Sequence, residues 1–187
     1  GAFISNTNPA SSAALKVLAP KAPSLVPFCL YSGKFSIKLF TPPGVNKQIV
    51  LSTIHHVLGG VMRNTANYEQ EIIQLKEAVK IAVRINHPDR QMTGNMNLGV
   101  AYLRMGQLDS ALYYAKAAQV FSNSPLAQGY TGNNLLTIGD IFLAKGDTAT
   151  AKKTYYEGLS SAYKQNNQAD VANLNHNLFR IYLMEGN

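Results

Sequence analysis

The chain lacks several residues and patterns that mark specialised proteins. It has no tryptophan, a single cysteine (Cys29), and only 14% charged residues among its 187. One cysteine cannot form an intramolecular disulfide, so cysteine usage does not indicate whether the protein belongs to an oxidising or a reducing compartment. No apolar run approaches the roughly 18 residues that a membrane-spanning helix needs. The N-terminus also lacks the charged-then-apolar pattern of a signal peptide, which leaves the compartment unknown.

Acidic residues are absent from the first 50 residues, which carry five lysines. The other 12 basic side chains are nearly balanced by all 10 acidic ones, so most of the net charge of +7 comes from the N-terminal part. Nucleic-acid binding usually needs Lys and Arg gathered on one face, with aromatic residues between them. We therefore expect no nucleic-acid partner, and binding through the basic N-terminal part is only a third alternative.

The motifs of common enzyme classes are also missing, including the nucleophile elbow and the glycine-rich phosphate loop. His55 and His56 form the only clustered histidine pair. Neighbouring residues on a helix point about 100° apart, so these two cannot chelate one metal without other ligands. We expect no catalytic residues, no metal and no cofactor, and therefore a protein that is not an enzyme.

The first 45 residues are rich in proline and differ from the rest. The stretch "NPASSAALKVL" predicts a short helix with Asn8 as its cap and Pro9 at its first position. The stretch "FCLYSGKFSIKLF" predicts a β-hairpin around Ser32-Gly33. An isolated hairpin is only marginally stable. We interpret residues 1–45 as an N-terminal extension that packs on or flanks a body formed by residues 46–187.

A period of 40 residues runs through that body. Its marker is an aliphatic residue followed by a glycine, and the places are Leu58-Gly59, Leu98-Gly99, Ile138-Gly139 and, with a change, Leu178-Phe179. A large residue follows three positions later each time, as Met62, Tyr102, Phe142 and Tyr182. The repeating units are residues 52–91, 92–131, 132–171 and 172–187, and the last unit holds a first helix only.

This pattern predicts a pair of antiparallel helices in each unit. The small residue lets the second helix cross closely. Gly106 and Gly146 then end the first helix, because glycine adopts the left-handed conformation of a helix C-cap without steric cost. Asp109 and Asp147 follow as candidate N-caps of the second helix. Small residues on the second helix, such as Ala118 and Gly158, allow the next unit to dock.

The stretches "NLGVAYLRMGQLDSALYYAKAA" and "LTIGDIFLAKGDTATAKKTYYEGL" resemble tetratricopeptide repeats (TPR). The resemblance covers about residues 47–187, although Glu71 stands in a small-residue place and Phe179 replaces a glycine. It implies an all-α fold, a TPR-like superhelix of about three and a half helix pairs.

A finer resemblance links "GQLDSALYYAKAA" to the repeats of sensor histidine kinases from Bacteroidetes-type bacteria. Those repeats form a periplasmic input module ahead of a membrane helix and a kinase domain, whose motifs this chain does not contain. The resemblance implies a sensory role and favours the periplasm, while a cytoplasmic location stays open.

TPR stacks curve, and the first helix of each pair lines the concave face. There, Asn amides could pair with a peptide backbone, and Arg104 or Arg180 could bind a carboxylate. The alternative is an Asn-rich solvated face without a ligand. The site residues that the repeat register predicts are Asn97, Arg104, Asn133, Asp140, Asn173, Asn177 and Arg180, with Thr93, Val100, Thr137 and His176 at further positions on the same face.

Two classes of function follow from this reading. The first is a non-catalytic module that binds a protein or peptide segment in its concave groove, as the sensory part of a bacterial signalling protein. The second is a structural scaffold that self-associates, as a homodimer for example, through residues 1–45 or the open end at 178–187. Neither class involves a membrane in this stretch of sequence.

Overall fold

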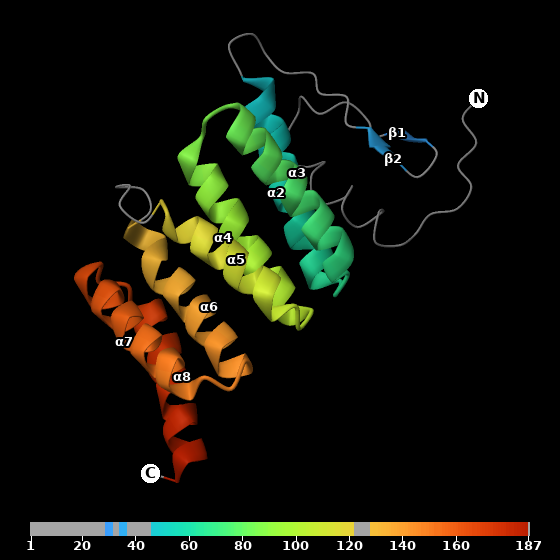
Figure 1. The fold of residues 1–187 in the computed structure, drawn as a ribbon. Helices are drawn as coiled ribbons and strands as arrows, with labels where there is room; N and C mark the ends of the chain where they lie inside the picture. The colour runs from blue at the N-terminus through green and yellow to red at the C-terminus, as the bar shows by residue number, and fades with distance from the viewer. Residues whose placement is uncertain (1–28, 32–33, 37–45, 122–127, 187) are drawn as a thin grey trace.

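The computed structural model describes residues 29–31, 34–36, 46–121 and 128–186. The chain is all-α over 46–121 and 128–186, which agrees with the predicted fold class, and consecutive helices pack against one another (Figure 1). The elements of this body are α2 (Lys47–Asn64), α3 (Tyr68–Arg84), α4 (Pro88–Arg104), α5 (Leu108–Gln119), the 3-10 helix η1 (Gln128–Tyr130), α6 (Thr131–Ala144), α7 (Thr148–Lys164) and α8 (Gln168–Glu185).

Two short strands precede the helices. Strand β1 (Cys29–Tyr31) pairs antiparallel with β2 (Lys34–Ser36), with Leu30 opposite Phe35. The turn at Ser32-Gly33 and the helix predicted after Asn8 lie outside the described residues.

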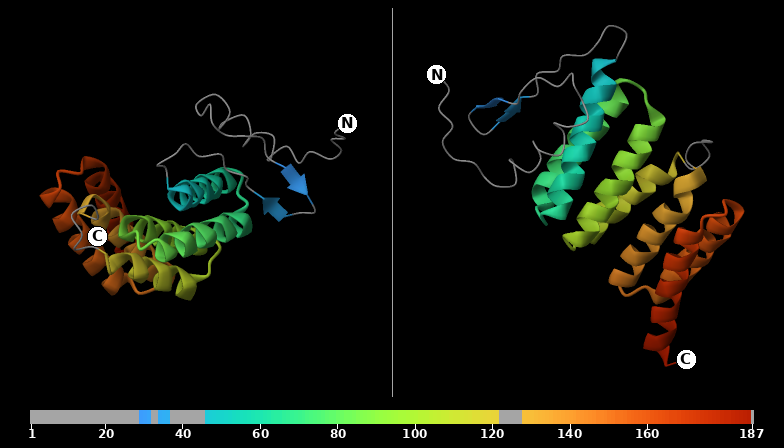
Figure 2. Two further views of the ribbon diagram at one scale, coloured as in Figure 1. Left: turned by 90° about the horizontal axis from the view of Figure 1, so that it is seen from above. Right: turned by 180° about the vertical axis from the view of Figure 1, so that it is seen from behind.

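The helices form three pairs and a final single helix. Helices α2 and α3, α4 and α5, and α6 and α7 pack as hairpins that stand side by side in sequence order, and α8 packs on α7 and α6 (Figure 2). The first helices also contact one another, because α4 touches α2 and α6, and α6 touches α8. These four helices therefore form a row, so side chains from distant parts of the sequence share one face.

The turns after α2, α3, α4, α6 and α7 share one backbone geometry. After α2, the backbone N–H of Asn67 donates to the carbonyl of Met62 and that of Ala66 donates to Arg63, the double hydrogen bond of a Schellman motif. One residue in each such turn, and one after α8, has a left-handed φ of 50° to 82°, and these residues are Ala66, Asn86, Gly106, Gly146, Asn166 and Gly186. Within 66–106 and within 146–186 these residues are 20 positions apart, so in those ranges each helix and its turn together span 20 residues. The predicted roles of Gly106 and Gly146 are confirmed.

Small residues set the distance between the two helices of a pair. A Cβ atom at Gly99 would lie 3.3 Å from the Cβ of Ala115, and one at Gly139 would lie 2.2 Å from Cε1 of Tyr155. The contact recurs in the first pair between Gly59 and Leu75. The predicted close crossing is therefore confirmed in all three pairs.

Only one of the two predicted N-caps is correct. The Asp147 carboxylate accepts a hydrogen bond from the backbone N–H of Thr150 at 3.0 Å and caps α7. Helix α5 instead begins at Leu108, and its N-cap residue is Gln107, which makes no side-chain cap hydrogen bond. Asp109 lies in the first turn and pairs with Lys145. The prediction for Asp109 was wrong because the turn places residue 107, not 109, at the cap.

Replacing Gly139 with alanine tests the close crossing. The new methyl group would collide with the ring of Tyr155, whose side chain is fully buried. Since overpacking a tight contact costs about 1–3 kcal/mol, we expect the midpoint of urea unfolding to fall. Gly60→Ala on α2 is the matched control, because a Cβ added there would have no neighbouring residue's atom within 4 Å in the described part of the chain. There we expect a gain of up to about 1 kcal/mol from the higher helix propensity of alanine. Equal midpoints for the two variants would contradict the crossing.

Candidate functional site

Two adjoining pockets lie along the row of first helices. The first has a volume of about 360 Å³ and the second about 420 Å³. They share His56, Thr93 and Tyr130, and we call them together the polar groove. The other lining residues of the first pocket are Ser52, Thr53, Ala78, His87, Asp89 and Arg90, and those of the second are Met96, Asn97, Gly129, Asn133, Asn167 and Asp170.

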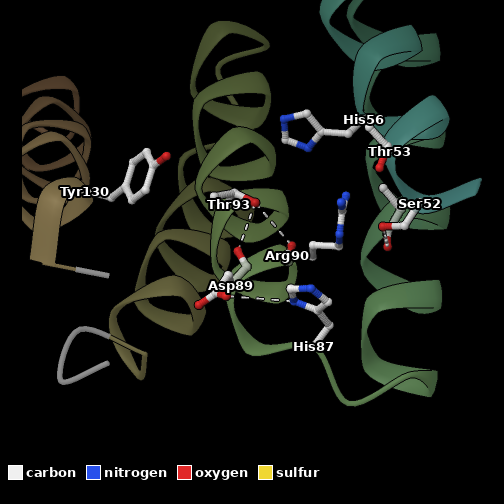
Figure 3. Close-up of a pocket in the computed structure, with 9 residues that line it drawn as sticks. Ser52, Thr53, His56, His87, Asp89, Arg90, Thr93 and Tyr130 are labelled. Atoms are coloured by element: carbon white, nitrogen blue, oxygen red, sulfur yellow. Dashed lines mark hydrogen bonds and ion pairs between the residues drawn. The ribbon is translucent and has the colours of Figure 1, made fainter. Parts of the chain in front are cut away.

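Helical spacing brings these side chains to one face. On α2, Ser52 and His56 are four residues apart, and on α4 the steps Arg90, Thr93 and Asn97 follow the same face of the helix. Figure 3 shows His56 reaching from α2 over α4, with Tyr130 on the other side of α4. The groove therefore crosses from one helix pair to the next.

A polar network fixes the wall of the groove between α2, α3 and α4. The Glu71 carboxylate is fully buried and accepts a hydrogen bond from Nε of Arg63 at 2.6 Å. Arg63 also donates from Nη2 to Oδ1 of Asn97 at 3.1 Å. Breaking a buried ion pair leaves an uncompensated charge and is strongly destabilising. The Glu71 side chain thus positions Asn97 through Arg63.

The same network determines the state of His56. Because Oδ1 of Asn97 accepts from Arg63, its Nδ2 amide is the donor to Nε2 of His56, at 3.1 Å. A neutral imidazole that accepts on Nε2 carries its proton on Nδ1. Burial, and then the positive charges of Arg63 and Arg90, lower the pKa of His56. His56 is therefore a neutral ring with its Nδ1–H as a donor, in a region of positive potential.

Arg90 and His87 hold polar atoms without partners. Nε of Arg90 is buried and has no hydrogen-bond acceptor among the described residues, and Nδ1 of His87 is also buried without one. The closest acidic group to His87 is Asp89, whose carboxylate oxygen lies 4.0 Å from Nδ1. Buried polar groups are nearly always hydrogen-bonded in folded proteins. Unused donors are therefore concentrated at the α2–α4 end of the groove.

The other end of the groove is acidic. Asp170 of α8 is buried and accepts hydrogen bonds from the backbone and side chain of Asn133. It lies so close to α6 that a Cβ on Gly132 would be 2.6 Å from its Oδ2. Burial raises the pKa of Asp170, while the hydrogen bonds from Asn133 oppose this rise. Asp170 thus caps the first turn of α6, whose own N-cap residue makes no side-chain hydrogen bond.

The predicted site residues divide into three groups. Asn97 and Asn133 line the second pocket. Asp140 and Asn177 instead bond to each other, because Nδ2 of Asn177 donates to Oδ1 of Asp140 at 2.6 Å. Arg180 donates to Oδ1 of Asn177 at 3.4 Å. These hydrogen bonds link α8 to α6. They occupy polar atoms that were predicted from the sequence to bind a ligand.

The Asp140 carboxylate also accepts a hydrogen bond from the hydroxyl of Tyr155 at 2.6 Å. Burial raises the pKa of Asp140, although the hydrogen bond from Tyr155 and the charge of Arg180 oppose this. The pKa of Tyr155 is raised as well, first by burial and then by its bond to Asp140. Asp140 therefore acts as a junction of α6, α7 and α8.

Arg104 and Asn173 form the third group. Both side chains are exposed, and neither lines either pocket of the polar groove. Thr93 lines both pockets, whereas Val100, Thr137 and His176 line neither. The groove therefore lies nearer to the start of α4 than the repeat register suggested.

Sequence reasoning missed His56, Arg90, Tyr130 and Asp170 as groove residues. From the sequence, His56 was assessed only together with His55, as a pair that cannot chelate one metal. The described residues contain no group of three His, Cys, Asp or Glu side chains placed to hold a metal. The available signal was the helical spacing from Arg90 through Thr93 to Asn97, which puts all three on one face.

Comparison with known proteins gives no match, either among protein-family models or among curated proteins. Within the part of the chain that the structure describes, no helix has the length and apolar character needed to span a membrane.

Titration of His56 tests the electrostatics of the groove. We expect its pKa, followed by NMR of the imidazole, to lie below 6.5 and to rise in Arg90→Gln, which removes a repelling charge. Arg104→Gln, at the far end of α4, is the control and should leave the value unchanged. A His56 pKa at or above 6.5 would contradict the geometry.

The lowered pKa of His56 makes the free energy of unfolding depend on pH. Between the lowered His56 pKa and 6.5, the folded protein binds fewer protons at this residue than the unfolded chain does. The contribution of His56 to the free energy of unfolding is therefore lost as pH falls through that window. His56→Gln should remove this part of the pH dependence in urea unfolding. An identical pH dependence in wild type and variant would contradict the assignment.

Proposed function

We propose that this chain is a non-catalytic repeat module that binds an extended protein or peptide segment in the polar groove. The observation that carries the proposal is that the two pockets adjoin each other across successive first helices. An extended peptide of several residues would contact α2, α4 and η1 in turn. A compact small molecule would use only one of the two pockets.

The lining residues suit a peptide. Tyr130 is 48% exposed and offers an aromatic face, while Met96 adds an apolar surface beside it. The side chain of Asn133 is exposed, and beyond its hydrogen bond to Asp170 it has a second amide hydrogen and an oxygen that suit a peptide backbone. Peptide sites commonly combine apolar pockets for side chains with polar groups that fix the backbone.

We further propose that the body is a TPR-like superhelix. Three features support this assignment: the turns that recur every 20 residues within 66–106 and 146–186, the small residues at each crossing, and the row formed by the first helices. In such repeats the concave face belongs to the first helices, and the polar groove lies on α2, α4 and the start of α6 and α8. The groove is therefore on the side where this class of proteins presents its binding surface.

The biological setting is proposed from the resemblance to sensor repeats. In that setting, binding of the segment would be the input signal of a bacterial signalling protein, in the periplasm. The chain itself would supply recognition and no chemistry.

A blocking substitution tests the groove. Peptides selected from a displayed library on the full chain would be measured for affinity to wild type and to Thr93→Tyr, which fills the position shared by both pockets. We expect a loss of about tenfold or more, since steric exclusion removes several contacts. Ser160→Tyr, at an exposed position of α7, is the matched control. Its affinity should be unchanged, and so should the melting temperatures of both variants.

Two results would count against this proposal. One is failure of the wild-type chain to select any peptide. The other is selection of peptides that bind Thr93→Tyr as tightly as wild type, which would place their site outside the groove.

A second candidate function, self-association, is favoured by the surface of α8. Phe179 and Leu183 are each 59% exposed and lie four residues apart on one face, and Met184 beside them is 64% exposed. Phe179 also stands where the first three repeats have glycine, so a helix could not cross α8 as closely there. An exposed apolar strip of this kind suits contact with a second copy of the chain.

Sedimentation velocity separates this candidate from the first. If α8 mediates assembly, wild type should form dimers, and Phe179→Ser with Leu183→Ser should be monomeric. Tyr113→Ser is the control, because Tyr113 is 68% exposed on α5, away from α8. A wild-type chain that is monomeric at all accessible concentrations would eliminate the scaffold function.

A further inference from the structure

We propose that the α2–α4 end of the polar groove binds an oxyanion, a carboxylate or a phosphate, through Arg90 and His56, with His87 at its edge. The inference deepens the proposed function and rests on it for the source of the anion, an acidic or phosphorylated residue of the bound segment. It adds a chemical class of ligand to the groove and a direction in which the segment lies.

Arg90 is the main argument. Its side chain is partly buried, it makes no ion pair within 4.0 Å in the described part of the chain, and its Nε is a buried donor without an acceptor. A guanidinium group presents five N–H donors in a planar fork that matches the oxygens of a carboxylate or phosphate. In Figure 3 the guanidinium extends from α4 toward α2, beneath His56. An oxyanion would supply the acceptor that Arg90 lacks.

The imidazoles provide further donors. His56 is locked by Asn97 with its proton on Nδ1, and that N–H has no partner among the described residues. Nδ1 of His87 is buried and likewise without a hydrogen bond.

The hydroxyl groups of the pocket do not compete for this role. Oγ1 of Thr53 donates to the carbonyl of Ile49 at 2.8 Å, and Oγ1 of Thr93 donates to that of Asp89 at 3.0 Å. Their protons are already used within their own helices. Apart from the hydroxyl of Tyr130, which lies on the other side of α4 (Figure 3), the donors left for an acceptor are the cationic and imidazole groups.

One opposing charge lines the same pocket. The Asp89 carboxylate would repel an anion, and it lies 4.0 Å from Nδ1 of His87, which therefore stays at the edge of the proposed site. Figure 3 shows Asp89 on the side of α4 away from His56 and the Arg90 guanidinium. Arg63 adds positive potential at His56 from the other side, although Glu71 pairs with it. The favourable position for an anion is therefore between Arg90 and His56, and the acidic Asp170 end of the groove is left for a neutral or cationic part of the ligand.

NMR titration of the full chain with inorganic phosphate and with acetate, at constant ionic strength, tests the pocket directly. We expect saturable shifts at the Arg90 Nε–H and the His56 ring. Arg90→Gln should weaken binding about tenfold, since a charge-assisted hydrogen bond is lost. Arg90→Lys keeps the charge without the fork and should fall between the two. The control Arg104→Gln, in the last turn of α4, should bind as wild type does.

Absence of saturable shifts with both anions would overturn the proposal. So would an equal loss in Arg90→Gln and Arg104→Gln, which would indicate non-specific charge attraction. Saturation by phosphate alone would support a phosphorylated residue as the source, and saturation by acetate as well would support an acidic side chain or chain end.

A peptide experiment distinguishes this proposal from the function on which it rests. Peptides selected on the groove would be compared with versions in which each Asp or Glu is replaced by its amide, on wild type and Arg90→Gln. We expect the amide versions to bind about tenfold more weakly to wild type, with little further loss in Arg90→Gln. Groove-bound peptides that are insensitive to both changes would overturn the anion site and leave the groove intact. Saturable phosphate binding without any peptide ligand would support the anion site and overturn the peptide-binding function.

Discussion

The close crossing of two helices over a small residue is the contact on which the rest of this structure depends. Gly59, Gly99 and Gly139 let the helices of the three pairs approach so closely that an added Cβ would lie 3.3 Å or less from a side chain of the second helix. That approach recurs in all three pairs, and the pairs stack in a row. Only because the first helices form that row do residues more than 30 positions apart meet in one groove.

Asn97 in the polar groove and Asn177 on α8 both link neighbouring first helices by hydrogen bonds, but their surroundings differ. Asn97 and Asn177 are 80 residues apart, at equivalent places in the repeat, and each bonds to the preceding first helix. The Asn177 amide donates to the Asp140 carboxylate, and this hydrogen bond links α8 to α6. Around Asn97 the hydrogen bonds do not include Arg90, whose buried Nε has no acceptor among the described residues. We attribute binding to this end because its hydrogen-bonding capacity is incomplete.

The sequence was a good guide to the fold and a weaker guide to the site, for a physical reason. Helix ends and crossings depend on local residues, so Gly146 and Asp147 could be placed from their own neighbourhood. The pairing of Arg63 with buried Glu71, and the approach of His56 to Arg90, depend on how far one helix lies from another. Residue spacing along the sequence does not give the distance between two helices. A small error in the repeat register therefore places the predicted groove at the wrong position along the helices.

The most direct test of the account is a crystal structure of the chain with a selected peptide bound. We expect an extended peptide that passes over α4 between His56 and Tyr130 and places an acidic or phosphorylated group in contact with Arg90. A peptide seated instead on the second helices α3, α5 and α7, or on the outer face of α8, would contradict it.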